Sequence, residues 1–179
     1  MIDFIEFLAA FFGFVYIVLI ILEKPFGWLF GFLSSLLYIE VCYRNDLFIQ
    51  TGLQSIYALV GIFGFFRWKF SHSSISAISN SIRIGFLLGG AGLSFFLGQL
   101  LSNSNQVLPY LDATISIFGL MATYLTTEKR IENWVIWMII NLLSIYLYAY
   151  QGLYVTVFLY VGYFLLSIWG YLNWKKEVE

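Results

Sequence analysis

The sequence predicts an all-α integral membrane protein with seven transmembrane helices, built as two three-helix repeats joined by one additional helix. Of its 179 residues, 61% are hydrophobic and only 11% are charged. A soluble domain is typically about 25% charged and about 45–50% apolar. The excess apolar surface can be accommodated only in lipid. Seven long apolar segments and an internal repeat complete the argument.

Each predicted helix is an apolar segment of about the 20 residues that a bilayer-spanning helix requires. The segments cover residues 4–22, 26–43, 47–68, 82–101, 110–127, 131–150 and 153–174. Helices are expected because a single segment in lipid can satisfy its backbone hydrogen bonds only in that conformation. The Ser-rich stretch 70–81 is predicted to be a solvated linker that contains His72, and 103–106 is predicted to be a loop.

The two halves of the chain match each other at a constant offset of 106 residues. Matched pairs include Trp28 with Trp134, Gly64 with Gly170, and Trp68 with Trp174. Pairing Glu23-Lys24 with Glu128-Lys129 requires a slip of one residue. The alternative is that two unrelated apolar bundles match by composition, which does not explain the matched loop residues.

Three helices per repeat is an odd number, so two repeats share one orientation only if another helix separates them. The repeats are therefore expected to be parallel, related by an axis along the membrane normal. Residues 1–69 form the first repeat, 70–105 the linker and fourth helix, and 106–179 the second repeat.

The distribution of basic residues predicts that the N-terminus is outside and the C-terminus is cytoplasmic. With this orientation, the outer helix ends carry only Arg44. The inner ends carry Lys24, Arg67, Lys69, Arg83, Lys129, Arg130, Lys175 and Lys176.

Several classes of function lack their sequence signals. There is no P-loop, no HExxH motif and no Cys/His cluster, since Cys42 and His72 are the only residues of their types. The net charge of −1 gives no reason to expect a nucleic-acid partner. We therefore expect no enzymatic activity, catalytic residue, metal or cofactor. Ionisable residues are also missing near the predicted bilayer centre, which argues against ion coupling.

Aromatic and amide side chains on three predicted helices form the candidate binding site. Trp134, Trp137 and Asn141 share one helical face by their spacing. The full set of candidate residues is Trp134, Trp137, Asn141, Gln54, Tyr57, Tyr160 and Tyr163. Such a set suits a flat polar heterocycle, and a cationic ring would gain about 0.5–2 kcal/mol per aromatic face.

Each of these residues also has a purely structural interpretation. Trp134 lies near a predicted helix end and could be an interfacial anchor. Asn141 and Gln54 could form interhelical hydrogen bonds, because a buried amide in lipid needs a partner. The repeat favours a binding role, since the matched positions differ: Gly31 stands opposite Trp137, Ser35 opposite Asn141, and Gln54 opposite Tyr160.

The run from Lys129 to Asn141, KRIENWVIWMIIN, resembles the signature region of the PnuC family of bacterial vitamin transporters. Ser144, the run Tyr150–Tyr154, Gln54 and Asp112 fit the same pattern. The resemblance implies a 3+1+3 architecture like that of full-length SWEET transporters. It assigns substrate contacts to Trp134, Trp137, Asn141 and Gln54.

The same resemblance implies a multi-pass homotrimer in the bacterial inner membrane. Its function would be facilitated diffusion of nicotinamide riboside or, as the alternative, of thiamine or another B vitamin or nucleoside. Uptake would be driven by a cytosolic kinase that phosphorylates the substrate, and the kinase would not need to contact the transporter. The sequence by itself leaves two other classes open, an intramembrane enzyme and a non-transporting scaffold or receptor.

Overall fold

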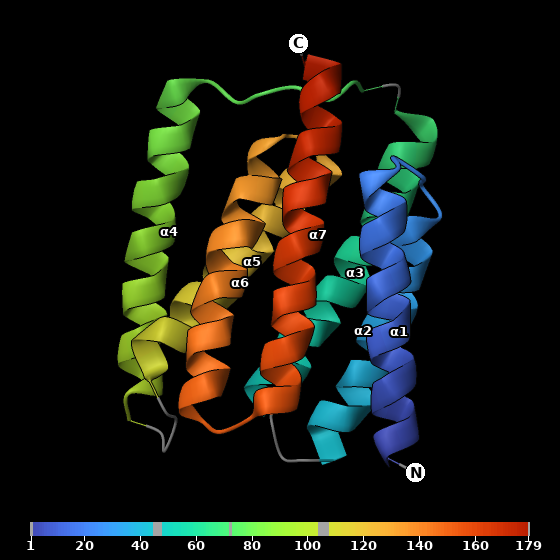
Figure 1. Cartoon of the computed structure of the whole chain (residues 1–179). Coiled ribbons are helices and arrows are strands. Elements are labelled where there is room, and N and C mark those ends of the chain that lie inside the picture. The colour runs from blue at the N-terminus through green and yellow to red at the C-terminus, as the bar shows by residue number, and fades with distance from the viewer. Residues whose placement is uncertain (1, 45–47, 72, 104–107, 179) are drawn as a thin grey trace. The chain divides into compact units, whose positions relative to one another are not determined.

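The computed structural model of the chain describes residues 2–44, 48–71, 73–103 and 108–178. It contains seven α-helices in these ranges (Figure 1). They are α1 (Ile2–Ile21), α2 (Gly27–Arg44), α3 (Phe48–Phe70), α4 (Asn80–Leu101), α5 (Pro109–Thr127), α6 (Glu132–Tyr150) and α7 (Tyr154–Val178). The seven predicted helices are confirmed, with ends that differ by a few residues. His72 and most of the predicted loop 103–106 lie outside the described residues.

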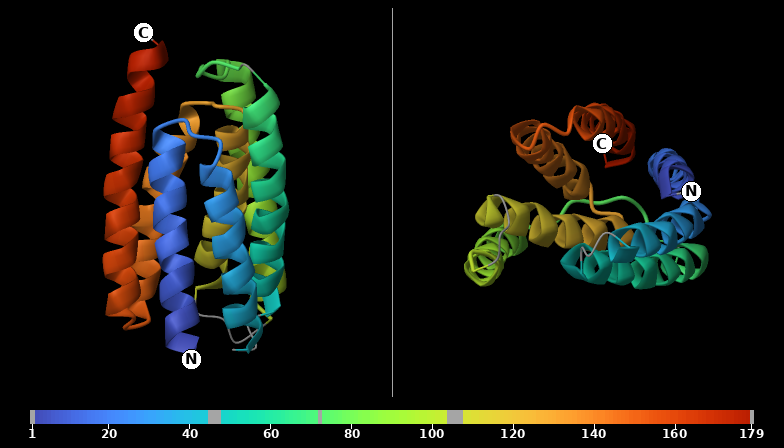
Figure 2. Two further views of the ribbon diagram at one scale, coloured as in Figure 1. Left: turned by 90° about the vertical axis from the view of Figure 1, so that its right-hand side faces the viewer. Right: turned by 90° about the horizontal axis from the view of Figure 1, so that it is seen from below.

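The chain divides into two compact units, Met1–Ser73 and Ser74–Glu179, referred to below as unit 1 and unit 2. In unit 1, α2 packs against both α1 and α3 (Figure 2). The hydroxyl of Ser34 on α2 donates a hydrogen bond to the carbonyl of Ala9 on α1, with an O–O distance of 2.8 Å. Gly61 lets α3 approach closely, because a Cβ at that position would lie 3.1 Å from the Cβ of Phe32 on α2.

In unit 2, α5 packs against α4 and α6, and α6 packs against α7. Two glycines allow the close contact between α4 and α5. A Cβ at Gly90 would lie 2.7 Å from Cζ of Phe118, and one at Gly98 would lie 2.4 Å from Cδ1 of Tyr110. The glycines of α4 therefore serve partly to accommodate aromatic rings of α5.

Large apolar side chains are exposed on every helix, as expected for a surface that faces lipid. Among the described residues, four segments are long and apolar enough to cross a membrane by length and composition. They are Phe4–Ile21, Asn80–Leu101, Glu132–Tyr150 and Thr156–Val178. The helices α2, α3 and α5 are more polar, and their membrane crossing remains a prediction.

The predicted Ser-rich linker 70–81 is shorter and more structured than expected. Helix α3 continues to Phe70, and α4 begins at Asn80 after an N-cap at Ser79. The hydroxyl of Ser79 accepts a hydrogen bond from the backbone N–H of Ile82. Serine at an N-cap satisfies one of the free N–H groups of a helix start, which explains why this polar segment begins a helix.

The α1–α2 turn and the α5–α6 turn have the same backbone hydrogen bonds at an offset of 106 residues. The N–H of Lys24 donates to the carbonyl of Leu19, and the N–H of Arg130 donates to that of Leu125, both with N–O distances of 2.8 Å. Positive backbone φ angles also match, 53° at Glu23 and 51° at Lys129. The turns thus correspond without the one-residue slip that side-chain identity suggested.

Candidate functional site

Trp134 lies in the first turn of α6 and is packed on two sides. Its ring meets that of Trp174 edge-on, with centroids 5.3 Å apart and an interplanar angle of 87°. A Cβ at Gly170 would lie 2.6 Å from Cδ2, Cε2 and Cε3 of Trp134, so only glycine fits beneath the ring. The side chain is only 3% exposed. An interfacial anchor presents its ring to lipid, so this alternative for Trp134 is wrong.

Unit 1 contains a matching cluster. Trp28 and Trp68 meet edge-on with centroids 5.6 Å apart and an interplanar angle of 84°. A Cβ at Gly64 would lie 2.4 Å from Cδ2 of Trp28. The packing of Trp134 is therefore a feature that both units share, and its contact with a substrate stays a prediction. In both units the Nε1 atom of the first tryptophan is buried and has no partner among the described residues.

Asn141 connects α6 to α7 through a short chain of polar contacts. Its Nδ2 donates to Oγ of Ser167 at 3.1 Å, and that hydroxyl donates to the carbonyl of Tyr163 at 2.8 Å. Asn141 and Ser167 are both buried. The interhelical hydrogen bond predicted as one alternative for Asn141 is confirmed. It also fixes the orientation of the amide, because a buried polar group without a partner would be unfavourable by about 1–3 kcal/mol.

A row of tyrosine rings continues from this contact. Tyr160 stacks on Tyr148 of α6, with centroids 5.1 Å apart and an interplanar angle of 21°. It also meets Tyr163 edge-on at 5.8 Å and 82°. Tyr160 and Tyr163 are half-buried. The structure thus links Asn141, Tyr160 and Tyr163 at the α6–α7 contact, through the hydrogen bonds of Ser167 and the contact between the two tyrosine rings.

Trp137 is half-buried, and its ring makes no aromatic contact among the described residues. The matched position in unit 1 is Gly31, and a Cβ there would lie 2.8 Å from Cδ2 of Tyr16 on α1. The position that matches Tyr16 in unit 2 is Ala122, which is fully buried. In unit 1 the large side chain is therefore on α1 and the small residue on α2. In unit 2 the small residue is on α5 and the large side chain on α6, the reverse of the matched helices.

Gln54 and Tyr57 lie in α3 of unit 1, and both are half-buried. Among the described residues of unit 1, the side-chain amide of Gln54 has no hydrogen-bond partner. Among the described residues of unit 1, the interhelical hydrogen bond predicted as one alternative for Gln54 is not formed. The other five candidate residues belong to unit 2.

Sequence reasoning missed Ser167 and Tyr148. Ser167 follows Tyr160 and Tyr163 at the spacing of one helical face, which was a usable signal. Tyr148 carried no comparable signal, because its contact with Tyr160 depends on how α6 and α7 pack.

The described residues contain no group of three or more His, Cys, Asp or Glu side chains able to hold a metal ion. Charged side chains on the described helices lie toward helix ends, as Glu40, Arg83 and Glu132 do. The described candidate residues of unit 2 therefore offer aromatic rings and neutral hydrogen-bonding groups.

Long apolar helices with lipid-facing apolar side chains define a multi-pass helical membrane protein. A family model described as nicotinamide mononucleotide transporter matches residues 3–176. The chain belongs to this family, and its predicted resemblance to PnuC proteins is confirmed.

Two curated relatives illustrate the range of the family. The chain is 27% identical over 190 residues to the nicotinamide riboside transporter PnuC of Neisseria mucosa, covering 96% of this chain and 72% of that protein. It is 25% identical over 156 residues to the riboflavin/roseoflavin transporter RibM of Streptomyces davaonensis, covering 82% and 73%. Both relatives are named as transporters.

One solved structure shares the fold. It is a crystal structure of the vitamin B3 transporter PnuC, which matches with a TM-score of 0.81 and 24% sequence identity. The match covers 98% of this chain and 82% of that one.

Proposed function

We propose that this protein transports nicotinamide riboside across the bacterial inner membrane by facilitated diffusion. Membership of a transporter family over residues 3–176 carries the proposal. The N. mucosa relative named for nicotinamide riboside supports this choice of substrate. Nicotinamide riboside has a flat, cationic ring with an amide, and the aromatic rings and amide at the α6–α7 contact match it chemically.

Within this proposal, Trp137, Asn141, Tyr160 and Tyr163 contact the substrate from unit 2, and Trp134 forms the end of the same face. Gln54 is proposed as a further contact by resemblance to the family, and Tyr57 because it shares a helical face with Gln54. The amide of Gln54 has no partner among the described residues of unit 1, which supports a role in hydrogen bonding to a ligand.

The proposed architecture is a 3+1+3 parallel repeat in which all seven helices cross the membrane. The matched turn hydrogen bonds and the matched tryptophan pairs support the repeat. The bias of basic residues supports an outer N-terminus and a cytoplasmic C-terminus. A homotrimer is proposed by resemblance to the family.

Transport is proposed to be uncoupled from ions. Ion-coupled carriers place ionisable groups near the bilayer centre, whereas the charged side chains on the described helices lie toward helix ends. A uniporter cannot concentrate its substrate, so accumulation requires that a cytosolic kinase convert the substrate to a trapped phosphate ester.

Proteoliposomes test both parts of the proposal. Labelled nicotinamide riboside should enter without an imposed gradient and stop at equal concentrations. With a nicotinamide riboside kinase and ATP enclosed, the internal label should exceed the external concentration. Uptake that requires a proton or sodium gradient would refute the uniport mechanism, and no saturable uptake under any condition would refute the substrate.

Riboflavin is a second candidate, because the S. davaonensis relative is named as a riboflavin/roseoflavin transporter. Its ring system is flat but neutral, so it would stack without the cationic contribution. A thermal-shift panel with nicotinamide riboside, riboflavin and thiamine distinguishes them. A ligand at 100 times its Kd should stabilise the protein by about 2.7 kcal/mol, and selective stabilisation by riboflavin would replace the first proposal.

A further inference from the structure

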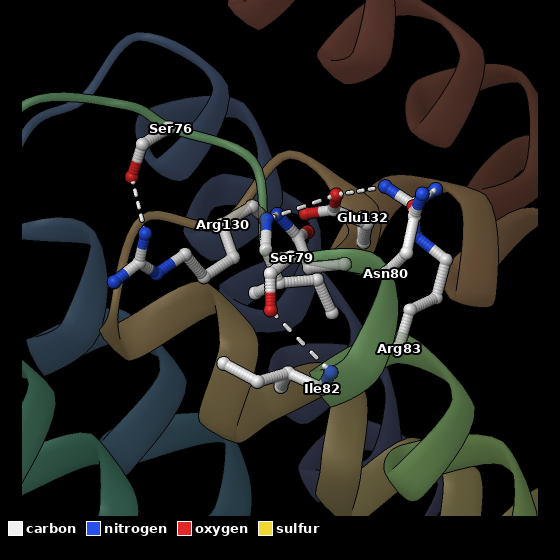
Figure 3. Close-up of polar contacts among 9 residues, drawn as sticks. Ser76, Ser79, Asn80, Ile82, Arg83, Arg130 and Glu132 are labelled. Atoms are coloured by element: carbon white, nitrogen blue, oxygen red, sulfur yellow. Dashed lines mark hydrogen bonds and ion pairs between the residues drawn. The ribbon is translucent and has the colours of Figure 1, made fainter.

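The segment between Ser74 and Ser79 is attached to the α5–α6 turn (Figure 3). The N–H of Ser76 donates to the carbonyl of Lys129, and the carbonyl of Ser76 accepts from the N–H of Ile131, both at 3.1 Å. Nη1 of Arg130 donates to Oγ of Ser76 at 2.6 Å. Backbone and side-chain contacts together fix this segment to the turn that precedes α6.

Glu132, the first residue of α6, joins three elements of unit 2 (Figure 3). Its Oε1 accepts a hydrogen bond from the N–H of Ile78 at 3.1 Å and forms an ion pair with Nη2 of Arg83 on α4 at 2.7 Å. The Glu132 side chain is 12% exposed, and that of Arg83 is 48% exposed. Charge-assisted hydrogen bonds to a largely buried carboxylate are stronger than those of an exposed pair, although the exposed guanidinium weakens this one by solvent screening.

These contacts replace the usual cap of a helix start. Ile131 is the N-cap residue of α6 and provides no side-chain hydrogen bond to it. The N–H groups at a helix start need partners. Here Ser76 accepts from the N–H of Ile131, so the start of α6 is held from outside the helix.

The arrangement is specific to the second half of the chain. The position that matches Glu132 in unit 1 is Phe26, whose exposed apolar side chain cannot accept a hydrogen bond. Arg83 lies on α4, which has no counterpart in the repeat. The first half therefore lacks this attachment at the turn that otherwise has the same backbone hydrogen bonds.

We propose that Glu132 and Arg83 are positioning residues that hold the first turns of α6, and with them Trp134 and Trp137, in the orientation that binds substrate. Trp134 and Trp137 follow Glu132 within the next turn and a half of the helix. The effect on substrate rests on the proposed function. In this arrangement α4 is more than a connector, because it anchors the substrate-binding helix through Arg83.

The test compares Glu132→Gln, Arg83→Gln and the double variant with the wild type. Arg44→Gln is the matched control, because Arg44 and Glu40 form an ion pair within α2, with both side chains about half exposed. Hydrogen exchange of the amides in residues 131–137 is measured without ligand, and the Kd for nicotinamide riboside is measured by calorimetry. Arg83→Gln changes a half-exposed side chain and should leave folding intact.

Both single variants should exchange amides 131–137 at least about tenfold faster, because the outside contacts suppress local opening of this turn. Each should raise the Kd on the order of tenfold, and the double variant should be no worse than the weaker-binding single one. Arg44→Gln should change neither quantity.

Unchanged exchange at 131–137 in both single variants would overturn the proposal. Faster exchange and a lower melting temperature with an unchanged Kd would also overturn it, since the contacts would then be structural only. If the wild type itself does not bind nicotinamide riboside, the proposed function fails, and the exchange rates still decide whether these residues hold the start of α6.

Discussion

Replacing Gly170 by alanine tests whether the packed Trp134 ring contributes to substrate binding. The added Cβ would lie 2.6 Å from three ring atoms of Trp134. Carbon atoms prefer separations of about 3.5–4.0 Å, so the ring must move by about 1 Å. Overpacking of this kind destabilises a core by about 1–3 kcal/mol. The tryptophan cannot move freely, because Trp174 covers its other side.

Gly64→Ala is the matched control, since its Cβ would lie 2.4 Å from Cδ2 of Trp28 in the equivalent cluster of unit 1. Both variants should lose a similar amount of stability. Only Gly170→Ala should weaken binding of nicotinamide riboside, by about 0.5–2 kcal/mol if a ring contact is lost, which is roughly a 2- to 30-fold rise in Kd.

Thermal unfolding and calorimetry on both variants provide the comparison, with binding measured at a temperature where each is folded. Equal loss of stability with an unchanged Kd in Gly170→Ala would show that Trp134 is a packing residue in both halves. An equal rise in Kd for Gly64→Ala would show that the effect spreads through the whole protein, and it would refute the assignment equally.

Three further experiments test the candidate site and the difference in side-chain size between the two units. Trp137→Ala should weaken substrate binding by about 1–3 kcal/mol through lost stacking, and an unchanged Kd in calorimetry would remove Trp137 from the site. Asn141→Ala should weaken binding to a similar extent. Ser167→Ala breaks the same hydrogen bond but keeps the amide of Asn141. Equal effects of the two variants on the Kd would mean that Asn141 acts only through its contact with α7. Gly31→Trp should destabilise the protein, because the new ring would clash with Tyr16. Adding Tyr16→Ala should restore much of the stability, because the matched positions in unit 2 already hold Trp137 and Ala122. A double variant that melts no higher than Gly31→Trp would contradict this reasoning.

The local features of the fold could be predicted from the sequence. The seven helices occur where the long apolar segments predicted them, because each segment must satisfy its backbone hydrogen bonds internally. The 106-residue offset follows from side-chain identity, and the same offset is found in the hydrogen bonds of two turns. The candidate residues of α6 and α7 were also identified by spacing, since a helical face is a property of one segment.

The contacts between helices depended on the tertiary structure. Spacing left two interpretations for Asn141, and only the packing of α6 on α7 provides Ser167 as its partner. Trp134 was equally consistent with an exposed anchor, and Gly170 is what allows α7 to cover the ring.

The sequence determined the class of protein, its helices and the residue types available for binding. It gave no indication of the contacts of Glu132. Ser76 and Arg83 are far from Glu132 along the chain, and a polar, Ser-rich segment has the composition of a solvated linker. Only the folded chain brings that segment and α4 to the start of α6. Hydrophobic length is set within one segment by the bilayer, whereas a hydrogen bond between segments depends on how helices rotate and pack, and no local pattern encodes that.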